Sequence, residues 1–182
     1  GEALTSFAFL SNTTFMKVAA GDAAMPLAVA GVAWDGAVTN RPGARFGPQA
    51  IRAASLMLCD GIHPVFDVSP AAHLGDALDM RLPNASALGV VRGHIEAQAA
   101  ELMERHHCVF LGGDHSVTLS LLRVAKAQYG LDGGSEPLAC VHFDAHCDTW
   151  PDHFGERSGH GTWTYEAIQE GLISPAHTVQ IG

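Results

Sequence analysis

The sequence predicts an α/β protein, a three-layer α/β/α sandwich with a mainly parallel sheet. Short apolar runs alternate with longer helical patterns along the chain, and polar residues cluster directly after two of these runs. Such alternation is typical of βαβ units, whose right-handed crossovers place helices on both faces of the sheet. A length of 182 residues suits a single domain, so we expect residues 1–182 to belong to one.

Four unbroken apolar runs have the length of strands that are buried on both faces. They are Leu27–Val32, Cys108–Leu111, Leu138–Phe143 and Thr178–Ile181. The segments between them carry helical patterns, two of which stop at a glycine, a residue that often follows a helix. We expect these helices at Pro48–Leu58, Ala85–Arg105, Val117–Tyr129 before Gly130, and Thr164–Glu170 before Gly171.

Composition argues against nucleic-acid and membrane partners. Lys and Arg total 10 against 19 Asp and Glu, and the resulting net charge of -9 repels phosphate backbones and anionic lipid. No apolar run approaches the roughly 18–20 residues of a membrane span. The four cysteines form no CxxC pair, which suits reduced thiols, so we expect a cytoplasmic protein. They are Cys59, Cys108, Cys140 and Cys147.

Asp144, His146 and Asp148 form the main candidate site. They directly follow the predicted strand Leu138–Phe143, and ligands of open parallel sheets bind at the carboxyl ends of strands. Because the three residues alternate, an extended chain would point their side chains to one face at a spacing of about 6.5–7 Å. A simpler alternative is that such residues only cap the loop that follows the strand.

His115 adds a fourth donor after another predicted strand, behind two glycines that permit a tight turn. Imidazole and carboxylate donors without a thiolate suit a divalent ion such as Mn²⁺, and carboxylates can bridge two ions. The two clusters together favour a metal site over loop capping.

These motifs carry a family resemblance. Gly112-Gly113-Asp114-His115-Ser116 and Asp144-Ala145-His146-Cys147-Asp148 resemble the paired metal motifs of ureohydrolases, a family of arginases, agmatinases and guanidino-acid hydrolases. The segment from Asp35 to Pro48 resembles the agmatinase-type N-terminal signature, although it also reads as a rigid turn before a helix. His160-Gly161-Thr162 resembles a later family motif.

The resemblance implies an arginase-like fold and a site with two Mn²⁺ ions. His115 and Asp148 would bind one ion, His146 the other, and Asp144 would bridge the two. A hydroxide shared by the ions would attack the guanidinium carbon, and urea and an amine would leave. His160 would move a proton to the departing amine. Without the resemblance, His160 is a loop histidine that bonds to the backbone.

The loop from Thr149 to Glu156 bears on the substrate. It lacks the Asn and Ser-rich pattern with which arginases hold an amino-acid carboxylate, so the resemblance favours agmatine over arginine. 4-Guanidinobutyrate and 3-guanidinopropionate are the alternatives. Trp150, Asp152 and His153 are candidates for substrate contact, although Trp150 can equally be a packing anchor.

The remaining histidines have no ligand spacing and are interpreted as surface or core polar residues. They are His63, His73, His94, His106, His107, His142 and His177.

Relatives of this kind carry a second D-x-D metal motif on a later strand and a later Glu that holds the guanidinium, and this sequence has neither. It supplies four of the usual six metal ligands, so we expect the N-terminal portion of a longer catalytic domain, weakly active or inactive alone. A non-catalytic binding or assembly module with the same fold is the alternative from another class. A deacetylase-type metallohydrolase fits the N-terminal and His160 motifs poorly. The resemblance also implies a homo-oligomer at full length.

Overall fold

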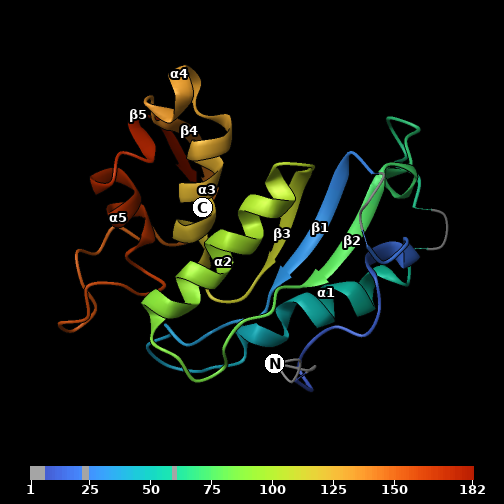
Figure 1. Ribbon diagram of the computed structural model, residues 1–182, viewed down its shortest axis with the longest axis horizontal. Helices are drawn as coiled ribbons and strands as arrows, with labels where there is room; N and C mark the ends of the chain where they lie inside the picture. Colours follow the sequence, from blue (N-terminus) through green and yellow to red (C-terminus); the bar gives the residue numbers. More distant parts are fainter. Residues whose placement is uncertain (1–6, 22–24, 59–60) are drawn as a thin grey trace.

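The computed structural model describes residues 7–21, 25–58 and 61–182, in which strands alternate with helices (Figure 1). The strands are β1 (Leu27–Val32), β2 (Leu74–Asp79), β3 (His107–Gly112), β4 (Leu138–Phe143) and β5 (Ile173–Ile181). The α-helices are α1 (Gly47–Ser55), α2 (Leu88–Met103), α3 (Val117–Tyr129), α4 (Leu131–Gly134) and α5 (Trp163–Gln169). Short 3₁₀ turns lie at η1 (Phe15–Lys17), η2 (Ala44–Phe46) and η3 (Pro70–Ala72). The α/β class predicted from the sequence is confirmed.

All strand pairs are parallel, but the strands form two sheets. One has the order β2-β1-β3, and the other consists of β4 and β5. The loop after β3 bends toward β1, where the Asp114 N–H donates to the Trp34 carbonyl at 2.9 Å. This contact ties the carboxyl end of β3 to β1, and no ladder joins β3 to β4 among the described residues.

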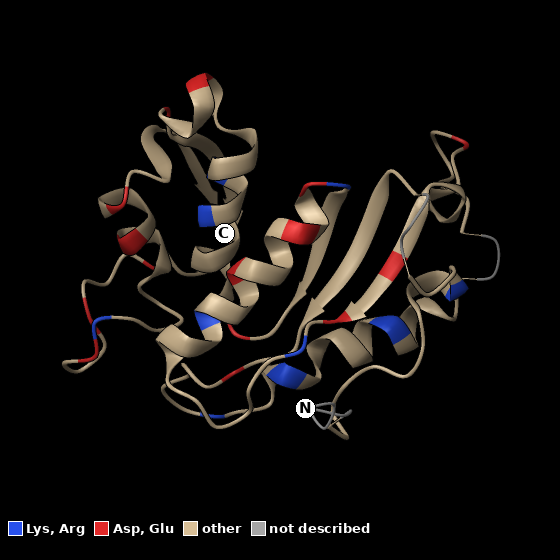
Figure 2. Ribbon diagram, viewed as in Figure 1, with Lys and Arg blue, Asp and Glu red and all other residues tan. Residues whose placement is uncertain are grey.

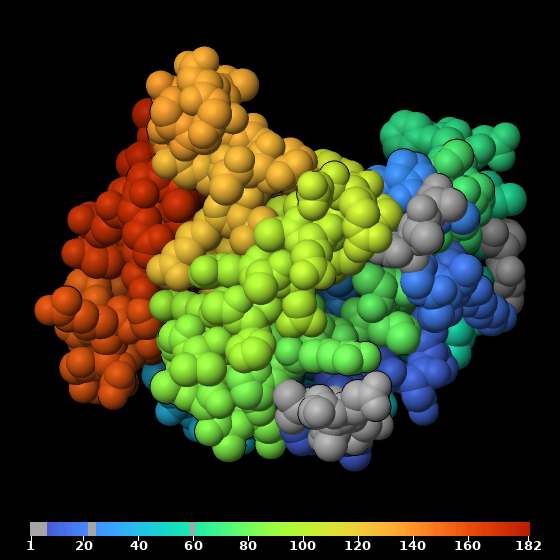
Figure 3. All heavy atoms as spheres, in the orientation of Figure 1, coloured from blue at the N-terminus to red at the C-terminus, as the bar shows by residue number. Residues whose placement is uncertain are grey.

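Helices cover both faces of the three-stranded sheet. Val32 of β1 packs in one buried cluster with residues of α2 and α3, such as Ile95 and Val124. The neighbouring residue Gly31 faces the opposite side of the sheet. A Cβ atom added to Gly31 would lie 3.1 Å from Arg52 Nη1 of α1. Because successive strand residues point to opposite faces, α1 and α2 cover opposite faces. On the face in Figure 3, α2 and α3 lie side by side over the strands.

The sheet of β4 and β5 is covered on one face only, contrary to the expectation that helices cover both. Leu138 and Cys140 pack beneath Leu119 of α3 and Trp163 of α5. The other face is apolar and exposed within the described residues. It consists of two cross-strand pairs, Val141 with Val179 and Phe143 with Ile181.

β2 was not predicted, because two aspartates interrupt its apolar pattern. Figure 2 shows that, of the five strands in the described residues, β2 is the one that carries Asp, Glu, Lys or Arg. Arg52 of α1 makes this possible. Its Nε and Nη2 lie 2.8 Å from the two carboxylate oxygens of Asp76, and its Nη1 lies 2.5 Å from Asp79 Oδ1. The buried charges are therefore paired and hydrogen-bonded.

Other differences concern element bounds. The predicted limits of Leu27–Val32, Leu138–Phe143 and Val117–Tyr129 are confirmed, whereas the helices predicted at Pro48–Leu58 and Ala85–Arg105 are shorter than predicted by two and five residues respectively. β5 begins at Ile173 instead of Thr178, because its first residue already pairs with Leu138 before a shift in register. Among the described residues, no helix is both long and apolar enough to cross a bilayer. Cys140 and Cys147 are free thiols, and Cys59 lies outside the described residues.

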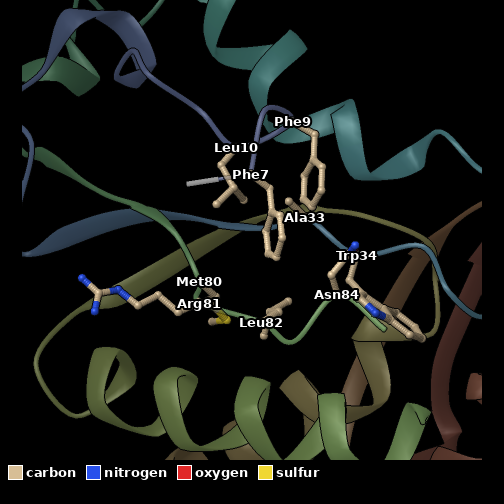
Figure 4. Close-up of a pocket in the computed structure, with 9 residues that line it drawn as sticks. All are labelled: Phe7, Phe9, Leu10, Ala33, Trp34, Met80, Arg81, Leu82 and Asn84. Carbon is tan, nitrogen blue, oxygen red and sulfur yellow. The ribbon is translucent and has the colours of Figure 1, made fainter. Parts of the chain in front are cut away.

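The N-terminal segment packs across the end of β1 (Figure 4). The rings of Phe7 and Phe9 stack with centroids 5.3 Å apart and lie above Ala33 and Met80. The space left between these side chains is about 20 Å³, which is room for about one water molecule. This apolar pocket is a packing contact and is too small to hold a substrate.

Candidate metal centre and adjoining cavity

Four donor side chains converge between the ends of β3 and β4. They are His115, His142, Asp144 and Asp148, and one ligand atom from each lies within 4.8 Å of all the others. His115 Nδ1 is 3.1 Å from Asp144 Oδ2 and 2.9 Å from Asp148 Oδ2. Two carboxylates and two imidazoles at such distances form a donor set that suits a hard or borderline divalent cation.

The chain reaches this arrangement through a turn and not through an extended strand. β4 ends at Phe143, and Asp148 has a φ of 52°, in the left-handed region that Asp tolerates better than most residues. The turn brings Asp148 back beside Asp144. The condition of an extended chain, under which all three side chains would share one face, is therefore not met, and Asp144 and Asp148 converge through the turn instead.

His146 lies at the edge of the cluster. Its ring Nδ1 is 3.1 Å from Asp144 Oδ1, and its side chain is 81% exposed. Its backbone N–H donates to the same Asp144 oxygen at 2.9 Å. The ring therefore faces the outer oxygen of Asp144, whereas His115 faces the inner one. The assignment of all four sequence-predicted ligands stays a prediction.

His142 was interpreted from the sequence as an ordinary polar residue, and the structure buries it inside the cluster. Its Nε2 lies 3.3 Å from Asp144 Oδ2. The alternation of His142, Asp144 and His146 along the sequence is a signal that would have placed it beside the site.

The cluster stabilises negative charge on Asp144. The backbone N–H of His146, together with the His146 and His142 side chains, lowers the pKa of Asp144 to about 2. Burial lowers the pKa of His115, although the Asp148 and Asp144 carboxylates oppose that shift. An ionised carboxylate and an unprotonated imidazole are the forms that bind a cation.

Trp163 supports Asp148 from α5. Its indole Nε1 donates to Asp148 Oδ2 at 2.7 Å, and the ring is almost fully buried. The Asp148 carbonyl accepts hydrogen bonds from the N–H groups of Thr164 and Tyr165 at the start of the same helix. Sequence reasoning missed Trp163, because nothing in its local pattern shows which carboxylate the indole would reach.

An open cavity of about 420 Å³ adjoins the cluster, a size typical of small-molecule sites. His146, Asp148, His160 and Trp150 are among its lining residues, and so is the buried His153. His160 is thus brought to the candidate site. Asp152 is not among the lining residues, and its Oδ1 accepts a hydrogen bond from the Gly155 N–H at 3.1 Å.

Residues 25–182 match the family model of the arginase family. The chain belongs to the arginase family. It is 41% identical over 162 residues to an agmatinase of Chromobacterium violaceum, a match that covers 86% of this chain and 48% of the relative. It is 37% identical over 183 residues to a guanidinopropionase of Pseudomonas aeruginosa, covering 96% of this chain and 54% of that relative. This arginase-family chain thus spans about half the length of the curated relatives it matches.

Solved structures agree with this family assignment. The proclavaminate amidinohydrolase of Streptomyces clavuligerus superposes with a TM-score of 0.83 at 35% identity, covering 97% of this chain and 58% of that one. A hypothetical agmatinase from Burkholderia thailandensis gives a TM-score of 0.81 at 35% identity, covering 93% and 53%. The arginase-like fold expected from the sequence is confirmed.

The N-terminal loop of this arginase-family chain, from Asp35 to Pro48, is held by internal hydrogen bonds and contacts the cavity beside the metal centre. Asp35 accepts hydrogen bonds from the N–H of Gly43 at 2.6 Å and from Arg45 Nε at 2.6 Å. Burial acts to raise the pKa of Asp35, but these bonds outweigh it and lower the pKa. Thr39 Oγ1 of the same loop lies 3.1 Å from His160 Nε2. The loop is therefore both a rigid turn and part of the cavity wall.

Proposed function

We propose that this chain carries part of the active site of a manganese hydrolase that cleaves a guanidino group to urea and an amine. One observation carries the proposal: the proposed ligands His115, Asp144 and Asp148 converge directly beside a cavity lined by His146 and His160. The agmatinase and guanidinopropionase relatives support the same reaction class.

The donor set fits divalent ions. It combines oxygen and nitrogen donors with no thiolate, and its carboxylates are held by neighbouring donors. We propose that His115 and Asp148 hold one ion, His146 the other, and Asp144 both, since its two oxygens face His115 and His146 respectively. Bound ions supply Lewis acidity and a water nucleophile at neutral pH.

His160 is the proposed proton donor to the departing amine. It lines the cavity with Asp148, and Thr39 holds its Nε2. An imidazole can carry a proton in either direction near neutral pH, which suits transfer to an amine leaving group. Its position in the cavity wall, outside the donor cluster, leaves it available for that transfer.

We propose agmatine as the substrate, with putrescine as the amine product. Among the described residues, neither this cavity nor the adjoining one, which shares Thr39 and His153 with it, is lined by a Lys or Arg that would bind a carboxylate. Glu156 lines the second cavity and favours a cationic tail. The guanidinopropionase relative supports a guanidino acid as the second candidate.

Urea release from the protein expressed from its complete gene tests the proposal. With Mn²⁺ added, agmatine should react faster than 4-guanidinobutyrate and 3-guanidinopropionate. His160→Asn should lower kcat by roughly 10²-fold or more, as expected for loss of a general acid. Urea formation from none of the three would contradict the hydrolase, and Mn²⁺ binding without turnover would favour a non-catalytic module.

A further inference from the structure

Gln180 of β5 contacts two parts of the candidate metal centre at once. Its side-chain Nε2 lies 2.7 Å from the Cys147 carbonyl oxygen and 2.9 Å from His142 Nδ1. The register of the parallel β4–β5 pair places Gln180 directly opposite His142, so both side chains lie on the same face of the sheet. Cys147 lies between the proposed ligands His146 and Asp148.

The identity of the Gln180 atom follows from its partners. A backbone carbonyl only accepts hydrogen bonds, so the atom that faces Cys147 must be the amide NH₂ group. The same nitrogen then donates to His142 Nδ1, which must be the acceptor. A flipped amide would set its oxygen against the Cys147 oxygen and lose that bond.

The tautomer of His142 follows in turn. An accepting Nδ1 leaves the single ring proton on Nε2, and Nε2 lies 3.3 Å from Asp144 Oδ2, which only accepts. The imidazole is buried and packed edge to face against Trp163, with ring centroids 4.8 Å apart, so its orientation is restricted. The chain of donors thus runs from Gln180 through His142 to Asp144.

We propose that Gln180 is a positioning residue that keeps His142 out of the metal ligand set and turns it into a hydrogen-bond donor to Asp144. A protonated Nε2 has no lone pair for a cation, although distance alone would admit His142 as a ligand. The second bond of Gln180, to Cys147, fixes the turn that carries Asp148. This inference rests on the proposed metal site and specifies which imidazoles bind there.

Manganese affinity is the first test, measured on the protein from its complete gene by the electron paramagnetic resonance signal of free Mn²⁺. Gln180→Leu should weaken binding about tenfold or more, the usual effect of losing a residue that orients a ligand. Gln169→Leu, an exposed glutamine at the end of α5, is the matched control and should bind as the parent does. Equal affinity in both variants would overturn the proposal.

A second test separates the donor role of His142 from a ligand role. His142→Gln keeps an N–H donor and should retain Mn²⁺ binding within about tenfold, whereas His142→Phe removes the donor and should lose more. If both variants abolish binding equally while the metal-free proteins keep their circular dichroism, His142 is a ligand and the proposal is wrong.

The tautomer itself is observable in the metal-free protein. Nitrogen-15 chemical shifts of labelled histidine, assigned with the His142→Gln variant, should show His142 protonated on Nε2, and Gln180→Glu should move the proton to Nδ1. A parent protein protonated on Nδ1 would overturn the proposal. Because neither affinity nor tautomer requires a substrate, an absence of urea release would contradict the proposed reaction and leave this inference standing.

Discussion

At the scale of single residues, the fold depends on charges that are buried only because they are paired. Arg52 is fully buried and binds both Asp76 and Asp79 of β2, and its Nη1 also lies 2.7 Å from Ser11 Oγ. One guanidinium therefore joins α1, β2 and the N-terminal segment. Removing one partner of such a group leaves the others desolvated and unpaired.

Arg52→Met should accordingly lower the free energy of unfolding by about 3–5 kcal/mol, because two buried carboxylates lose their counterion. Urea denaturation followed by circular dichroism measures the change. Arg41→Met is the control, since Arg41 is exposed in the N-terminal loop and should change stability by less than about 0.5 kcal/mol. A loss in Arg52→Met no larger than this would show that the buried ion pairs contribute little.

Asp144 gives the metal-free protein a defined acid sensitivity. Its pKa is about 2 in the folded protein against 3.8 ordinarily, so the folded state binds fewer protons than the unfolded chain between about pH 4 and pH 2. The contribution of Asp144 to stability is therefore complete above about pH 4 and is lost as the pH falls through that window.

Melting temperatures recorded from pH 5 to pH 2 should show this loss, and Asp144→Asn should flatten part of the slope. Asp132→Asn, in an exposed turn, is the matched control and should keep the slope of the parent protein. Identical slopes in the two variants would contradict the assigned hydrogen bonds of Asp144.

At the scale of elements, the turn between β3 and α3 sets the position of His115. Gly113 has a φ of 40°, and a Cβ on it would lie 2.4 Å from the Val32 carbonyl oxygen and 2.5 Å from that of Trp34. The turn therefore needs both the left-handed backbone and the close approach that glycine allows.

Gly113→Ala should destabilise the protein by about 1–2 kcal/mol from the backbone alone, with a further loss from the two contacts. Gly93→Ala should have the opposite sign. Gly93 is exposed inside α2 with open space around it, and alanine there should stabilise the helix by about 1 kcal/mol. Chemical denaturation of both variants measures the two changes in the free energy of unfolding. Equal destabilisation of both variants would contradict a special backbone requirement at Gly113.

Helix α5 supports the Asp148 carboxylate through one side-chain donor, the Trp163 indole. Trp163→Phe keeps a ring in the core but removes the hydrogen bond to Asp148, so Mn²⁺ affinity should fall about tenfold and stability by about 1–3 kcal/mol. Trp150→Phe is a suitable comparison, because Trp150 lines the cavity but has no place in the donor cluster. Calorimetric titration should show that the Trp150→Phe variant binds Mn²⁺ with the same affinity as the parent protein.

At the scale of the whole molecule, the exposed face of β4 and β5 distinguishes this structure from a fully covered sandwich. Val141 and Phe143 are 64% and 73% exposed, and their partners Val179 and Ile181 are exposed beside them. Adjacent apolar side chains on a sheet with free edges favour association. Assembly into homo-oligomers stays a prediction.

The 182-residue chain expressed by itself should therefore bind a hydrophobic dye, and the double variant Val141→Thr with Phe143→Thr should reduce the fluorescence severalfold. Val90→Thr, an exposed valine on α2, is the control and should leave the signal unchanged. Fluorescence that is insensitive to the double variant would place the dye elsewhere.

The sequence by itself determined the alternation of strands and helices, because strands buried in a parallel sheet require continuous apolar runs and helices require a periodic pattern. It also placed His115 and the Asp144–Asp148 motif directly after two strands, at the carboxyl ends where ligands of such sheets bind. Both features follow from the pattern of residues within single segments and from the order of those segments along the chain.

Only the tertiary structure decided the rest. β2 is a strand despite two aspartates, because Arg52 from another element neutralises them. Asp148 joins the cluster through a turn, and Trp163 and Gln180 reach it through helix packing and strand register. Such contacts join residues that are distant in the chain or depend on the direction of a turn. They therefore cannot be predicted from a local sequence pattern.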